Sequence, residues 1–168
     1  MRQPAKGPEG FRLQEDSPNV TFLMKEIKDR DPQIFIYYVE HLSLVFEKLK
    51  DIYFIIEEHD GSCYFGFEFQ DGRRVPSWLL SGGTLQLIAM TLPACLPKFR
   101  DILVIEEPEN RLHPTNLDVI YQSLASVYEG QVLLTSHSPM FLGQSKPKQV
   151  CFFSKKSSRW QHAGSGRR

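Results

Sequence analysis

The sequence predicts an α/β fold, in which helices flank a parallel sheet core and an antiparallel hairpin lies upstream. A short, wholly apolar run at residues 102–105 and a mainly apolar run at 132–135 alternate with helical patterns, as expected where parallel strands are buried on both faces. Upstream, the runs at 51–58 and 63–69 favour strands and are joined by a turn sequence, which indicates the hairpin. The 168 residues suffice for one domain with a hydrophobic core.

Composition and charge narrow the class of protein. The chain holds 20 basic and 20 acidic side chains, and the zero net charge argues against a generally basic nucleic-acid-binding protein. No apolar stretch approaches the ~18 residues of a membrane span. The three cysteines lack metal-ligand spacing, provide no disulfide framework and suit a reducing compartment. We therefore expect a cytoplasmic protein that has no membrane partner.

Four regions differ in character along the chain. Residues 1–19 are rich in proline, glycine and charge, which indicates a flexible leader. Residues 20–76 are expected to hold the hairpin and one amphipathic helix, over 33–50. Residues 77–154 carry the α/β pattern, and residues 155–168 are expected to form a loose polar tail.

Helix boundaries within the α/β region follow from caps and prolines. A helix is predicted over 83–95, with Pro93 as a possible kink. Further helices are predicted to begin at His113 and at Ser138, each of which precedes a proline, and a last strand is predicted over 150–153. The second of these three helices has a core stripe at Leu117, Ile120, Tyr121, Leu124 and Val127.

Two carboxylates follow the apolar run at 102–105. Ligands bind at the carboxyl ends of strands in open α/β sheets, and Glu106 and Glu107 are placed there. Adjacent strand residues point to opposite sides, so one carboxylate could reach a magnesium ion while the other polarises a water molecule. The alternative is a buried strand that ends in a solvated acidic turn, since Pro108-Glu109-Asn110 is a typical loop sequence.

Polar residues also precede a helix and follow the second apolar run. Ser81 is a candidate N-cap, and the glycines at 82 and 83 allow close backbone approach to an anion at the helix N-terminus. His137 lies at the ligand edge of the sheet, where it could hydrogen-bond a phosphate or a lytic water molecule. Each feature also has a purely structural interpretation, as a capped helix after a turn and as a loop histidine bonded to backbone.

In their order and spacing, these segments resemble the ABC-type ATPase domain of the AAA family. Residues 80–86 match the signature motif, 102–107 the Walker B strand and 136–138 the switch histidine. The sequence of residues 106–114, Glu-Glu-Pro-Glu-Asn-x-x-His-Pro, is similar to that of soluble ATPases related to the overcoming-lysogenization-defect proteins. The resemblance implies the C-terminal lobe of a P-loop NTPase head from the branch that includes chromosome-structuring, recombination-repair and phage-defence ATPases.

The resemblance also implies roles for individual residues. Glu107 would be the catalytic base, His137 would sense the γ-phosphate of ATP, and Glu106 would hold Mg²⁺, where the family more often has Asp. Ser81 and Gly83 would contact ATP bound to the opposite protomer of a dimer. The remaining matched positions of the signature motif are Gly82 and Gln86, while Thr84 stands where Gln or Glu is common.

The phosphate-binding Walker A loop of the family, G-x-x-x-x-G-K-S/T, does not occur in residues 1–168. The nearest match has glycines at 61 and 66, but Phe67 and Glu68 follow where lysine and a hydroxyl residue should be. We therefore expect the isolated chain to bind ATP weakly and to act as an ATPase only when a Walker A segment completes it. The expected assembly is a homodimer or a pairing with a Walker A-bearing polypeptide.

Two other functions stay open from the sequence. The chain could be a non-catalytic interaction module, or a truncated relic, that donates its signature motif to a partner ATPase. Direct DNA binding would use the basic residues near the C-terminus, which a solvated tail explains equally well. For the ATPase itself, the resemblance suggests a DNA-repair or phage-defence system in which the partner is a nuclease or DNA.

Overall fold

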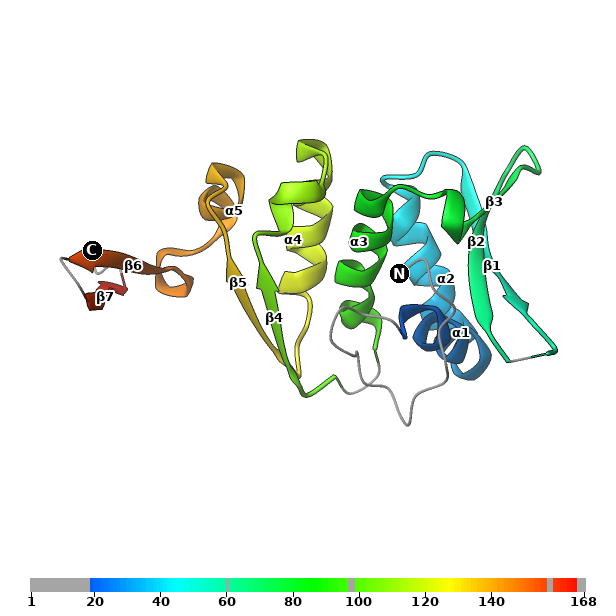
Figure 1. Ribbon diagram of the computed structural model, residues 1–168, viewed down its shortest axis with the longest axis horizontal. Coiled ribbons are helices and arrows are strands. Elements are labelled where there is room, and N and C mark those ends of the chain that lie inside the picture. The colour runs from blue at the N-terminus through cyan, green and yellow to red at the C-terminus, as the bar shows by residue number, and fades with distance from the viewer. Residues whose placement is uncertain (1–18, 60, 97–98, 157–158, 166–168) are drawn as a thin grey trace.

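A computed structural model describes residues 19–59, 61–96, 99–156 and 159–165. The expected flexible leader lies outside these residues, except for Asn19. The described residues form three sheets, β1-β2-β3, β4-β5 and β6-β7, and Figure 1 shows helices α1 to α4 between the first sheet and the second. In the part that the structure describes, no helix is long and apolar enough to cross a bilayer.

The first half of the chain packs two helices on an antiparallel sheet. Helices α1 (Val20–Arg30) and α2 (Pro32–Ser43) are followed by strands β1 (Leu49–Ile56), β2 (Cys63–Phe69) and β3 (Arg74–Pro76), which pair in the order β1-β2-β3. The predicted hairpin is thus confirmed as β1 and β2, which are antiparallel. The two helices cover one face of this sheet (Figure 1).

Several details of this half differ from the prediction. The helix that begins after Asp31 ends at Ser43, because the chain turns there and Lys48 takes a positive φ of 63° just before β1. Its start is as predicted, since the Asp31 carboxylate accepts a hydrogen bond from Ile34 N. Neither α1 nor β3 was expected, although α1 has the helical spacing of buried side chains at Val20, Leu23, Met24 and Ile27.

The second half contains the predicted parallel pair. It comprises α3 (Gly82–Thr91), β4 (Ile102–Glu106), α4 (Leu117–Ala125), β5 (Gln131–Thr135) and α5 (Pro139–Gln144). Strands β4 and β5 pair in parallel, in a register that sets Glu106 opposite Thr135. Short 3-10 helices cover Ser77–Leu79, Leu92–Cys95, Pro108–Arg111, Pro114–Asn116 and Pro147–Gln149.

The parallel strands are not buried on both faces, as their apolar sequences had suggested. One face packs against the core through Ile105, which is 7% exposed. On the other face Ile102, Val104 and Leu133 are 61%, 63% and 57% exposed. An apolar strand sequence indicates that both faces of the strand are covered in the complete sheet. Only two strands of this sheet lie in the described residues.

The C-terminal segment also departs from the prediction. Strand β6 (Cys151–Lys156) extends beyond the predicted 150–153 and pairs antiparallel with β7 (Arg159–Ser165). The expectation of a loose tail from residue 155 is therefore wrong for these strand residues. Alternating polar and apolar residues at 159–163 are compatible with a strand, whereas the polar composition of the segment favours a loose tail.

Two hydrogen bonds, one buried and one partly buried, join the halves of the chain. Tyr38 of α2 donates its hydroxyl proton to the backbone oxygen of Ile88 in α3 at 2.8 Å, and burial raises the pKa of Tyr38 well above its usual range. His41 of α2 lies 2.6 Å from Ser123 Oγ in α4, and burial lowers the pKa of His41. Helix α2 thereby fixes α3 and α4, the helices that carry the candidate functional segments.

Gly130 sets the close approach at the base of the parallel pair. A Cβ at this position would lie 2.5 Å from the Phe99 ring and 2.9 Å from the backbone oxygen of Asp101. We expect Gly130→Ala to lower the free energy of unfolding by about 1–3 kcal/mol, because the backbone has to move. Gly143→Ala is the matched control, since a Cβ there meets nothing within 4 Å. Urea denaturation checks both, and equal stabilities would contradict the close packing at Gly130.

Candidate functional site

The candidate site forms where β4 and β5 end side by side. The last rung of the parallel pair continues one residue beyond β4, as Glu107 N donates to the backbone oxygen of Thr135 at 2.9 Å. Glu106 is exposed and, by strand alternation, belongs to the open face of the sheet. That Glu106 and Glu107 point in different directions stays a prediction from strand alternation.

Glu107 has an unusual backbone conformation. Its φ of 41° and ψ of 60° place it in the left-handed region, which costs a residue with a side chain on the order of 1 kcal/mol or more. This conformation turns the chain sharply from β4 into the 3-10 helix Pro108–Arg111. Strain of this kind at a candidate catalytic carboxylate is typical of functional sites.

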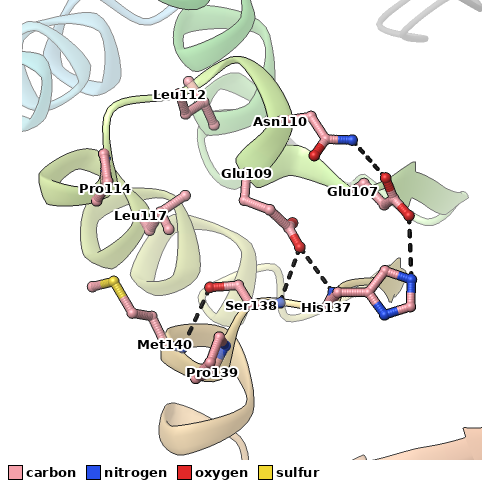
Figure 2. Close-up of a pocket in the computed structure, with 10 residues that line it drawn as sticks. All are labelled: Glu107, Glu109, Asn110, Leu112, Pro114, Leu117, His137, Ser138, Pro139 and Met140. Atoms are coloured by element: carbon pink, nitrogen blue, oxygen red, sulfur yellow. Dashed lines mark hydrogen bonds and ion pairs between the residues drawn. The ribbon is translucent and has the colours of Figure 1, made fainter.

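The Glu107 side chain is held from two sides (Figure 2). Asn110 Nδ2 donates to Glu107 Oε2 at 2.5 Å, and His137 Nε2 lies 3.4 Å from Glu107 Oε1. The structure thus brings together Glu107 and His137, which the sequence had picked out separately. An oriented carboxylate beside an exposed imidazole can align a water molecule and accept its proton.

Glu109 is a member of the site that sequence reasoning treated only as a loop residue. Its Oε1 accepts hydrogen bonds from Ser136 Oγ at 2.7 Å, His137 N at 2.9 Å and Ser138 N at 3.1 Å. Burial alone raises the pKa of the Glu109 carboxyl, but hydrogen bonds from its own backbone N–H and from residues 136–138 outweigh burial, and the net pKa lies below the ordinary value. The available signal was the run of backbone N–H groups at 136–138, which need an acceptor.

A cavity of about 400 Å³ opens beside these side chains. Figure 2 shows its polar side formed by Glu107, Glu109, Asn110 and His137. The rest of its lining is mainly apolar and comes from the loop before α4, from α4 and from α5: Leu112, Pro114, Leu117, Ser138, Pro139 and Met140.

The signature-like segment is separate from this cavity. Ser81 caps α3, since its Oγ accepts a hydrogen bond from Thr84 N at 3.1 Å. Ser81 and Gly82 are exposed, and a Cβ at Gly82 would meet nothing within 4 Å. None of Ser81, Gly82, Gly83 and Gln86 lines the cavity. The structure therefore presents two separate candidate surfaces, which are the cavity beside Glu107 and the N-terminus of α3.

The chain has only part of the ligand set that a magnesium ion needs. No group of three or more His, Cys, Asp or Glu side chains suited to a metal occurs among the described residues. Protein sites for Mg²⁺ on nucleotides commonly use one or two carboxylates, with phosphate oxygens and water as the other ligands. The exposed carboxylate of Glu106 fits that role of a single protein ligand.

The fold is similar to that of a solved ATPase head domain. The chain is similar to the Smc head domain with a coiled coil and joint from Pyrococcus yayanosii, with a TM-score of 0.54 and 15% sequence identity. That likeness covers 84% of this chain and 30% of the Smc chain, so this chain spans about a third of that structure. At such identity the likeness shows the fold alone.

A family model matches most of the chain. Residues 7–143 match the family described as "AAA domain, putative AbiEii toxin, Type IV TA system". The chain belongs to this family of AAA domains, whose members are ATPases that bind ATP with Mg²⁺. No curated protein matches the sequence.

The backbone strain at Glu107 predicts that a substitution can gain stability while it loses the carboxylate. Asn tolerates the left-handed region better than Glu or Gln does. We expect Glu107→Asn to be more stable than Glu107→Gln by on the order of 1 kcal/mol, because both remove the carboxylate and only Asn relieves the strain. Thermal denaturation of the two variants measures the difference. A Gln variant at least as stable as the Asn variant would show that residue 107 is unstrained.

Proposed function

We propose that the chain forms the C-terminal lobe of an ABC-type ATPase and contributes to ATP binding and hydrolysis once a Walker A segment completes the site. The observation that carries this proposal is that Asn110 and His137 both contact the Glu107 carboxylate at the end of the parallel pair. A surface carboxylate with no chemical task has no need of a strained backbone and two polar partners.

Each side chain has a definite task in this proposal. Glu107 accepts the proton of the attacking water molecule, and Asn110 keeps its carboxylate aligned. His137 donates a hydrogen bond to the γ-phosphate from the neighbouring strand end. Glu106 binds Mg²⁺, which supplies charge neutralisation on the phosphates when it is bound. The protein's own contribution is placement of these groups along one edge of the sheet.

The signature segment serves a second nucleotide in this proposal. Ser81 and Gly83 contact the γ-phosphate of ATP held by the opposite subunit, at the N-terminus of α3. The exposure of Ser81 and the open space around Gly82 support this role, since a phosphate can approach the backbone N–H groups there. The assembly is a homodimer or a pairing with a Walker A-bearing polypeptide.

The completing segment covers the open face of β4 and β5 in this proposal. Ile102, Val104 and Leu133 expose apolar side chains on that face, which a parallel sheet normally buries. A strand and helix that carry G-x-x-x-x-G-K-S/T would bury them and supply the phosphate anchor. The wider system is DNA repair or phage defence, with a nuclease or DNA as partner and the cytoplasm as location.

A non-catalytic function is the second candidate. The signature segment is capped and presented independently of the carboxylate site, so it could serve a partner ATPase even if Glu107 does no chemistry. The two candidates differ in whether Glu107 is needed for hydrolysis in the assembly.

Glu107→Gln separates these candidates. The chain is mixed with a polypeptide that carries the Walker A motif, and hydrolysis of ATP is measured. We expect Glu107→Gln to lower kcat by roughly 10²–10⁴-fold, because the general base is lost while the shape is kept. Glu129→Gln, which removes an exposed carboxylate at the start of β5, is the control and retains activity. An unchanged rate in Glu107→Gln would support the non-catalytic candidate.

Ser81→Asp separates the structural role of Ser81 from phosphate contact. Aspartate caps helices as well as serine does, so the free energy of unfolding should stay within about 0.5 kcal/mol of the wild type. Its negative charge faces the incoming phosphate, so ATP-dependent dimer formation should be lost. Analytical ultracentrifugation of the chain mixed with the Walker A-bearing polypeptide, with and without ATP, measures this. A variant that still dimerises with ATP would remove Ser81 from the proposed interface.

A further inference from the structure

One carboxylate joins the loop after β4 to the loop after β5. Glu109 lies on the 3-10 helix Pro108–Arg111, and its Oε1 accepts hydrogen bonds from a side chain and two consecutive backbone N–H groups of the loop 136–138. Because backbone groups are bound, Glu109 fixes the path of that loop rather than one side chain.

His137 depends on that path for its position. Its side chain is 90% exposed, so packing does not hold the ring. The ring nonetheless lies 3.4 Å from Glu107 Oε1, and the backbone N–H of His137 donates a hydrogen bond to Glu109 Oε1. Figure 2 shows Glu109 between the two chain segments, with His137 reaching past it to Glu107.

We propose that Glu109 is a positioning residue, whose carboxylate holds the loop 136–138 so that His137 stands against Glu107. Its consequence for hydrolysis rests on the proposed function of this site. The positional relation itself concerns this chain alone and needs no nucleotide.

The charge of Glu109 suits this task. The hydrogen bonds it accepts lower its pKa, so the carboxylate is ionised at neutral pH, and bonds from N–H groups to an ionised acceptor are stronger than neutral ones. The other ionisable side chains that line the cavity are Glu107 and His137. Oε2 of Glu109 is buried and accepts no hydrogen bond from a described residue, so glutamine would keep one acceptor but bury an unpaired NH₂ group.

Amide hydrogen exchange of the full chain, followed by NMR, tests the first step. We expect Glu109→Ala to speed exchange of the His137 amide by roughly tenfold or more, since a hydrogen bond to a charged group is lost. Ser138 N also lies 2.9 Å from Ser136 Oγ, so its amide should change less. Glu109→Gln should give a smaller change than Glu109→Ala. Glu129→Ala, which removes an exposed carboxylate near the other end of β5, is the control.

The ring of His137 tests the second step. In the wild-type chain, Glu107→Gln should shift the NMR signals of the His137 ring, because the two side chains are in contact. In the Glu109→Ala background the same substitution should shift them much less. Amides of β4 and β5 in the same spectra report whether the fold is kept, and Glu109→Gln provides the same comparison if the alanine variant unfolds.

Two results would overturn the proposal: wild-type exchange of the His137 amide in both Glu109 variants, or an undiminished effect of Glu107→Gln on the ring. Neither measurement contains nucleotide or a partner. A failure of the proposed ATPase function would therefore leave them intact, and a failure here would leave Glu107 and its role untouched.

Discussion

The parallel pairing of β4 with β5 is the constraint on which the candidate site depends. Its register sets Glu106 opposite Thr135, and the bond from Glu107 N to Thr135 O carries the pairing one residue further. Side chains about 30 positions apart in the sequence are thereby placed at one sheet edge. A shift of register by one residue would reverse which side chains face the core and would separate Glu107 from His137.

Around that edge, short-range interactions orient Glu107 and long-range interactions position His137. The left-handed turn at Glu107 and the bond from Asn110 orient one carboxylate from within its own loop. The histidine is set from a distance, through Glu109 and the loop after β5. Helix α2 stabilises α3 through a buried hydrogen bond and α4 through a partly buried one. The site therefore combines local strain with a stable support.

The sequence predicted most of what local chemistry determines. The cap at Asp31, the apolar run of β4 and the proline start of α5 each lie where the sequence indicated, and the α/β class is confirmed. The helix predicted from His113 begins instead as the 3-10 helix Pro114–Asn116, and α4 follows from Leu117. Glu107 and His137 were identified because they follow buried strands. Glu109 was missed because its partners are 27 to 29 residues away, and no local pattern marks such a contact. The exposure of one face of β4 was not predicted, because an apolar strand sequence does not show whether the segment that covers it lies in the same stretch of chain.

Nucleotide affinity tests the central claim most directly, namely that this chain supplies the carboxylate, histidine and signature groups while another segment anchors the ATP. Binding of a fluorescent ATP analogue with Mg²⁺ would be titrated with the chain alone, with the Walker A-bearing polypeptide alone and with both. We expect tight binding only where the Walker A motif is present, tighter still in the mixture, and lost when the lysine of that motif is replaced. Equally tight binding by the isolated chain would contradict the claim.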